Sequence, residues 1–181
     1  MANSTTAPDG GGETRRDFLL LATTAAAGFG VAAVAWPFID QMNPAADTLA
    51  LGSIKVDLSK IAVGQAITVK WRGKPVFIRH RTAAEIAQAT KDDKATLIDP
   101  QPDGMRVQKP QWLVLEGVCT HLGCIPKGQK SGERKGEFGG WFCPCHGSHY
   151  DTSGRIRKGP APTNLPVPSY KFLTDTQIQI G

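Results

Sequence analysis

All four cysteines of the chain lie in two short stretches that also hold two of its four histidines. The first box is Cys119-Thr120-His121-Leu122-Gly123-Cys124, and the second box is Cys143-Pro144-Cys145-His146-Gly147-Ser148. Each box offers one Cys–His pair and one further cysteine. Thiolate and imidazole are both metal ligands, and the two further cysteines make an even pair. The two boxes therefore predict a metal centre together with a disulfide.

The donor set narrows the choice of metal, because thiolate and imidazole suit zinc or iron–sulfur. The patterns C-x-H-x-x-C and C-x-C-H match a [2Fe–2S] centre that has two Cys on one iron and two His on the other. A zinc ribbon more often uses two C-x-x-C knuckles, which the sequence lacks. If Cys124 and Cys145 both lie behind the cluster, they can bond to each other. The candidate ligands are Cys119, His121, Cys143 and His146.

Sequence around the boxes extends the pattern. Gly139–Phe142 precedes the second box, Ser148–Asp151 runs on from its last residue, and Gly154–Pro162 comes next. With these stretches the chain, from Thr14 onward, resembles the family of Rieske iron–sulfur subunits of bacterial cytochrome bc1 complexes (ubiquinol–cytochrome c reductase).

The resemblance implies a role for each site residue. Cys119 and Cys143 would hold the buried iron of a [2Fe–2S] cluster, and His121 and His146 the redox-active iron. His146 would face the quinol and accept a proton as the cluster accepts one electron, with His121 as the second exposed ligand. The further roles are a Cys124–Cys145 disulfide, hydrogen bonds from Ser148 and Tyr150 that raise the reduction potential, and a shielding third loop, Gly159–Pro162.

The same resemblance implies the partners. The protein would be the electron-transfer subunit of an enzyme, taking electrons from ubiquinol in cytochrome b. It would deliver them to cytochrome c1 by a movement of its soluble part, within a complex that is a dimer. The net charge of +5 comes from scattered Lys and Arg, not a basic stripe, so nucleic acid is not an expected partner. A stable disulfide requires an oxidising compartment outside the cytosol.

The N-terminal third predicts export and a membrane anchor. Residues 1–17 are expected to be disordered and cytoplasmic, and they end in a twin-arginine motif at Thr14–Leu20. Residues 18–39 carry no charge and would span about 33 Å as a helix, enough to cross a bilayer once. Arg15 and Arg16 would keep the N-terminus cytoplasmic, which places the rest on the periplasmic side of the bacterial inner membrane. A cleaved signal peptide is the alternative, and residues 40–51 would form a flexible hinge.

Residues 52–181 read as a mainly β Rieske head, with a cluster-binding subdomain at about 112–162. Apolar residues alternate at Ile54–Leu58 and Ile67–Trp71, and a turn leads to Val76–Ile78. A capping box at Thr82 opens a short helix to about Thr90, and 91–111 reads as loop. We expect an antiparallel β-sandwich or open barrel with the boxes at one end. The further strands expected are Trp112–Leu115, Ser148–Asp151, Ile156–Lys158, Tyr170–Phe172 and Gln177–Ile180.

Other functions remain possible from the sequence. A Rieske ferredoxin or oxygenase component usually lacks the second cysteine pair and the anchor. A b6f-type plastoquinol complex is disfavoured because Gly154–Pro162 resembles the bc1 type, and a structural zinc module would have no redox role. One segment departs from the expected pattern: residues 127–137 form a basic insertion between the boxes, whose role the resemblance does not supply.

Overall fold

The computed structural model describes residues 14–45, 48 and 52–181. Contacts divide the chain at residues 46 and 47 into two units: an N-terminal helical unit and a larger β unit, here called the head. The predictions for residues 1–13, and for residues 46, 47 and 49–51 of the hinge, lie outside the described residues.

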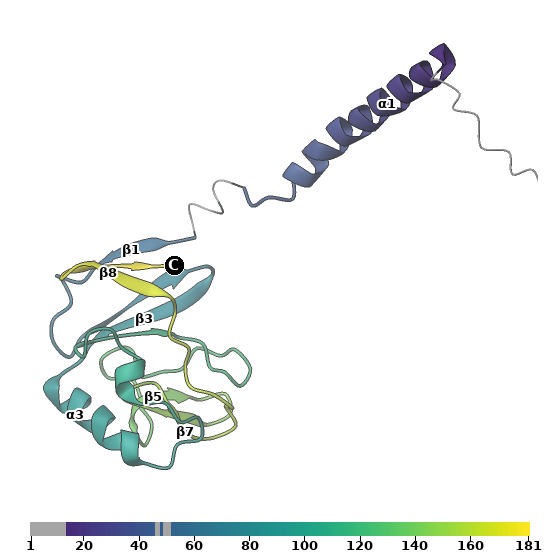
Figure 1. Ribbon diagram of the computed structural model, residues 1–181. Helices are drawn as coiled ribbons and strands as arrows, with labels where there is room; N and C mark the ends of the chain where they lie inside the picture. Colours follow the sequence, from purple (N-terminus) through teal and green to yellow (C-terminus); the bar gives the residue numbers. More distant parts are fainter. Residues whose placement is uncertain (1–13, 46–47, 49–51) are drawn as a thin grey trace, which may run out of the picture. The chain divides into compact units, whose positions relative to one another are not determined.

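The N-terminal unit is the helix α1, Arg15–Asp40, drawn in purple and blue in Figure 1. Thr14 caps it: its hydroxyl accepts from the Asp17 N–H, and the Asp17 carboxylate accepts from the Thr14 N–H at 3.1 Å. This capping box starts the helix at Arg15, so residues 15–17 are helical where disorder was predicted. By length and composition the helix can cross a membrane, and it contains both arginines of the twin-arginine motif.

The described part of the head is mainly β, as predicted, and its strands pair into three small antiparallel sheets (Figure 1). The sheet orders are β1-β9-β8, β2-β3-β4 and β5-β6-β7. These antiparallel sheets confirm the predicted mainly β head, and the pairing divides it into three sheets of three strands each among the described residues. The strands are β1 Ile54–Asp57, β2 Ala66–Trp71, β3 Lys74–His80, β4 Trp112–Glu116, β5 Gly139–Cys143, β6 Ser148–Asp151, β7 Ile156–Lys158, β8 Tyr170–Thr174 and β9 Gln177–Ile180.

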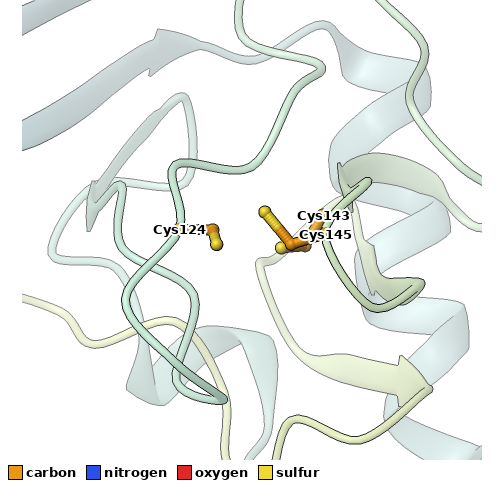
Figure 2. A group of neighbouring side chains, drawn as sticks. All are labelled: Cys124, Cys143 and Cys145. Carbon is orange, nitrogen blue, oxygen red and sulfur yellow. The ribbon is translucent and has the colours of Figure 1, made fainter.

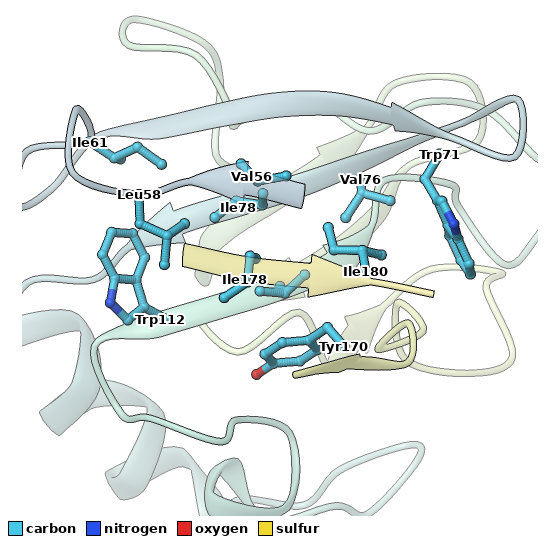
Figure 3. Packing of buried hydrophobic residues seen from close by; sticks show 11 residues of the cluster. Val56, Leu58, Ile61, Trp71, Val76, Ile78, Trp112, Tyr170, Ile178 and Ile180 are labelled. Atoms are coloured by element: carbon cyan, nitrogen blue, oxygen red, sulfur yellow. The ribbon is translucent and has the colours of Figure 1, made fainter. Parts of the chain in front are cut away.

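The sheet β2-β3-β4 is covered on both faces, because its side chains alternate between two cores. Val76, Ile78 and Val114 join a core with Ile178 and other residues of β1, β8 and β9, which Figure 3 shows. The intervening Phe77, Leu113 and Leu115 join a second core with residues of β5, β6 and β7. A strand buried on both faces reads as a continuous apolar run, which explains the sequence Trp-Leu-Val-Leu of β4.

Helix α3, Ala83–Lys91, and its Thr82 capping box confirm the short helix predicted after β3. The stretch predicted as loop contains two 3-10 turns, Asp92–Lys94 and Asp103–Met105. Strand β5 was missed as a strand, because Gly139 and Gly140 have low strand propensity. Gly140 is needed there: a Cβ atom at that position would lie 1.8 Å from the Asp151 carbonyl oxygen.

Buried ion pairs link the segment around the 3-10 turns to β6 and β7. Arg81 forms a bidentate pair with Asp103 at 2.7 and 3.1 Å, and Ser153 also donates to Asp103 at 2.5 Å. Arg155, fully buried, donates to Asp151 at 2.8 Å and also pairs with Asp93. Such pairs are costly to leave half-formed, since a lone buried charge is destabilising by about 3–5 kcal/mol. They hold the irregular segment in one arrangement.

Replacing Leu115 by Ala should destabilise the head by about 2–5 kcal/mol, because Leu115 of β4 is fully buried against the β5-β6-β7 sheet. Urea unfolding of the detergent-solubilised chain measures the change. Leu173→Ala is the control: Leu173 is 39% exposed on β8 and should cost under about 1 kcal/mol. Equal losses in the two variants would contradict the two-core packing.

Candidate metal centre

Both boxes are tight loops at strand ends. Strand β4 leads into the first box, and the second box joins β5 to β6. In the first box the Gly123 N–H donates to the Cys119 carbonyl at 2.9 Å, and in the second the Gly147 N–H donates to the Cys143 carbonyl at 3.0 Å. Gly123 and Gly147 have φ of 80° and 77°, a left-handed conformation that glycine adopts without strain. Each box therefore closes on itself and presents its side chains in a fixed direction.

The cysteines differ sharply in burial. Cys119 and Cys143 are each 2% exposed and belong to the second core, whereas Cys124 is half-buried and Cys145 is exposed. The Sγ atoms of Cys124, Cys143 and Cys145 all lie within 4.8 Å of one another, and Figure 2 shows Cys124 facing the other two from the opposite loop. All four cysteines are free thiols in the structure. The Sγ atoms of Cys124 and Cys145 are thus close in space, and the predicted disulfide between them stays a proposal.

The two predicted histidine ligands also meet. The ring centroids of His121 and His146 lie 4.7 Å apart, with the ring planes nearly perpendicular at 85°. His146 is exposed and His121 is half-buried. The Nδ1 atom of His121 is buried and has no hydrogen-bond partner among the described residues. A buried imidazole nitrogen without a partner is unfavourable, and a metal ligated there would satisfy it.

The two hydroxyls predicted to tune the potential lie beside the thiols. Tyr150 is fully buried, and its hydroxyl donates to the Cys119 Sγ at 3.2 Å. Ser148 is 1% exposed, and its Oγ accepts from the Ala161 N–H at 3.2 Å. That bond leaves the Ser148 hydroxyl proton available to a further acceptor, and it joins the second box to the third loop.

Burial dominates the titration of these groups. It raises the pKa of the Cys143 thiol to about 12, with the neighbouring Cys119 adding to the rise. The pKa of Tyr150 is also raised, first by burial and then by its bond to Cys119. A Cys143 thiol with this pKa is protonated at neutral pH. Binding of a metal cluster must therefore displace its proton, which couples cluster insertion to proton release.

The remaining two histidines, His80 and His149, have structural partners. His80 Nδ1 lies 2.7 Å from the Ile61 carbonyl oxygen, and the ring stacks on Trp112 at 4.1 Å between centroids. His149 Nδ1 accepts from the Glu137 N–H at 3.1 Å, and the residue is only 6% exposed. Neither belongs to the group formed by the two boxes.

Sequence reasoning missed the side chains that tie the boxes to the third loop. Thr120, inside the first box, donates its hydroxyl to the Thr163 carbonyl at 2.7 Å. Asn164 follows directly, is 5% exposed, and bonds to Asp99 and to β7. The signal available was the polar pair Thr163-Asn164 after Pro162, and periodicity could not connect Asn164 to Asp99.

Two buried thiols, two adjacent imidazoles and an unpartnered ring nitrogen fit a cluster bound by two Cys and two His. This donor set on three small antiparallel sheets defines a Rieske-type iron–sulfur protein. Two family models match the chain: "Rieske [2Fe-2S] domain" over residues 59–171, and "Ubiquitinol-cytochrome C reductase Fe-S subunit TAT signal" over residues 5–45. The cofactor is therefore a Rieske [2Fe–2S] cluster, and the apolar helix carries a twin-arginine export signal.

Curated relatives cover the chain from end to end. The ubiquinol-cytochrome c reductase iron-sulfur subunit of Rhodospirillum rubrum is 66% identical over 99% of this chain and 98% of its own. That of Blastochloris viridis is 59% identical over 100% and 98%. A chain of the solved "Hyperthermophilic respiratory Complex III" superposes with a TM-score of 0.53 at 25% identity, over 87% of this chain and 97% of that one. The chain belongs to the family of ubiquinol–cytochrome c reductase iron–sulfur subunits.

Iron content tests the ligand set. His121→Ala should abolish cluster binding in the isolated protein, because it removes the buried ring nitrogen that no described residue contacts by a hydrogen bond. His149→Asn is the matched control: its amide oxygen can still accept from the Glu137 N–H, so iron and sulfide should stay at wild-type levels. Metal analysis and the visible spectrum report both. Full iron in the His121 variant would exclude His121 as a ligand.

Proposed function

We propose that the chain takes one electron from ubiquinol at the quinol-oxidation site of cytochrome b and passes it to cytochrome c1. The observation that carries this proposal is the exposed ring of His146, whose centroid lies 4.7 Å from that of the half-buried His121. Both histidines lie in the loops that also hold the two buried thiols. When bound, the [2Fe–2S] cluster supplies a one-electron acceptor whose two imidazole ligands raise its potential above that of an all-cysteine cluster.

His146 is the residue that meets the quinol. Its exposed ring can reach a hydroxyl of a docked quinol, whereas His121 is partly covered. A [2Fe–2S] cluster held by Cys119, Cys143, His121 and His146 would accept one electron from the quinol, and the free ring nitrogen of His146 would accept one hydroxyl proton. The quinol would thereby lose one hydrogen atom in total. The imidazole would keep that proton until the electron is passed to cytochrome c1.

The surface around His146 suits docking onto a membrane subunit. Leu122, in the first box, is 69% exposed, and Ile125, just after it, is 60% exposed. Exposed apolar side chains beside a reactive imidazole favour contact with an apolar, water-poor quinol site. Burial of these two residues on docking would exclude water from the proton transfer between the quinol and His146.

The membrane arrangement follows from α1. We infer a single-pass anchor with a cytoplasmic N-terminus, because Arg15 and Arg16 precede the apolar run. The head then lies on the periplasmic side of the bacterial inner membrane, where a Cys124–Cys145 disulfide would be stable. Residues 40–51 would act as the hinge on which the head moves between cytochrome b and cytochrome c1, in a dimeric complex.

Ser148→Ala and Tyr150→Phe should each lower the midpoint potential of the cluster by roughly 60 mV, because each removes one hydrogen bond that favours the reduced state. Redox titration followed by EPR, in the complex purified with its b-type and c-type haems, measures the shift. Quinol oxidation should slow in the same order as the potentials fall. Unchanged midpoints in both variants would refute these roles, and an EPR-silent wild type would refute the function.

The proposed disulfide is tested by thiol labelling. In the native complex, maleimide should label neither Cys124 nor Cys145, although Cys145 is exposed. After mild reduction both should label, and the cluster should be lost faster, because the two loops are no longer tied. A Cys145→Ser variant measures the same loss without reductant. Labelling of both thiols before reduction would show that the bond does not form.

A further inference from the structure

The third loop, Gly159–Pro162, lies directly against the second box. A Cβ atom at Gly159 would come within 2.6 Å of the Gly147 carbonyl oxygen and of the Ser148 Cα. Ala161 is 2% exposed, and its N–H donates to the Ser148 Oγ at 3.2 Å. Any displacement of this loop therefore changes the hydrogen bonding of Ser148.

The chain leaving the third loop is fixed by Asn164. Its backbone N–H donates to the Asp99 carboxylate at 2.9 Å, and its side-chain amide donates to the Asp99 carbonyl at 3.0 Å. Its side-chain oxygen accepts from the Ile156 N–H of β7 at 2.9 Å. One buried side chain thus joins the third loop, β7 and the segment before the second 3-10 turn. The Asp99–Asn164 pair is called the clamp below.

Two buried arginines bond to the residues that flank the clamp in sequence. Arg106 donates to the Gln101 side chain at 2.5 Å and to the carbonyl of Leu165, the residue after Asn164, at 2.6 Å. Arg155 donates to the Gln101 carbonyl at 3.2 Å. Burial lowers the pKa of Arg106 to about 10, which still leaves it charged at neutral pH. The clamp therefore lies beside the hydrogen bonds of two buried, charged guanidinium groups.

We propose that Asp99 and Asn164 are positioning residues of the cluster site, acting through the third loop on Ser148. This inference rests on the proposed function. In the described structure neither side chain bonds to a candidate ligand. With the clamp closed, the Ala161 N–H occupies the Ser148 oxygen and so directs the Ser148 hydroxyl proton away from the loop, toward the cluster. With the clamp open, that hydroxyl rotates freely and the loop no longer shields the cluster flank from water.

The experiment compares full-length variants in the purified complex. Asn164→Ala removes two side-chain bonds, and Asp99→Ala removes one. Asp99→Asn keeps an acceptor for the Asn164 N–H and should restore wild-type behaviour. Asp175→Ala is the surface control, because within the described part of the chain the exposed Asp175 pairs only with Lys109. The readouts are the midpoint potential and the rate at which visible absorbance bleaches in mild denaturant.

Asn164→Ala should bleach about tenfold faster than wild type, which is the loss expected for one to two net hydrogen bonds. Its midpoint should fall in the same direction as that of Ser148→Ala. Asp99→Ala should show a smaller change of the same kind, and it keeps the test available if the Asn164 variant does not fold. In the Asn164→Ala, Ser148→Ala double variant, the midpoint should equal that of Ser148→Ala alone, because both changes remove one interaction.

A purely structural role makes a different prediction. The Asn164 and Asp99 variants would then unfold at lower temperature with an unchanged midpoint, or their shifts would add to that of Ser148→Ala, and either result overturns the clamp. A wild-type complex without a cluster signal would sink the proposed function. A normal wild-type signal with Asn164 and Asp99 variants that match it would sink the clamp alone.

Discussion

The head depends on one constraint: two tight loops from different sheets must meet with their buried thiols adjacent. Strand β4 fixes the first box because it is buried on both faces and runs straight into Cys119. Strands β5 and β6 fix the second, since Cys143 ends one and Ser148 begins the other, paired across the turn. The Tyr150 hydroxyl on the Cys119 Sγ joins the two directly. The metal site is therefore largely formed by the packing of the second core.

The periodic part of this architecture could be read from the sequence. The alternation of apolar and polar residues predicted β1 and β2, and the capping box at Thr82 predicted α3. Strand β5 was not predicted, because its glycines disfavour a strand in the sequence. Gly140 is required by the close approach of the paired strand β6, which the sequence alone does not show. The assignment of the strands to three sheets was not predicted, since pairing depends on contacts between residues far apart in sequence.

The candidate site divides in the same way. Spacing within each box predicted the Cys and His ligands, because each box offers one Cys and one His two or three residues apart on one loop. The charged stretch at 91–111 was read as loop, although Arg81 meets Asp103 and Arg155 meets Asp93 inside the protein. The basic insertion likewise folds back on itself: the Glu133 carboxylate accepts from the Gly128 and Lys130 N–H groups at 3.0 and 3.1 Å. Ion pairs and hydrogen bonds of this kind produce no periodic pattern in the sequence, so the sequence could not predict them.

The buried arginines fix the positions of the segments around them more than they add to the free energy of unfolding. Well-packed apolar residues would often stabilise as much as a buried ion pair, so net free energy does not explain arginines buried between β6 and the 3-10 turns. A planar guanidinium instead fixes several backbone carbonyls at once: Arg106 contacts those of Ser153 and Leu165 at 2.8 and 2.6 Å. A hydrogen bond to a cluster changes its potential only while donor and acceptor stay aligned. If the head carries its cluster between partners, as we propose, that alignment must survive the movement, and the directional network beneath the third loop would maintain it.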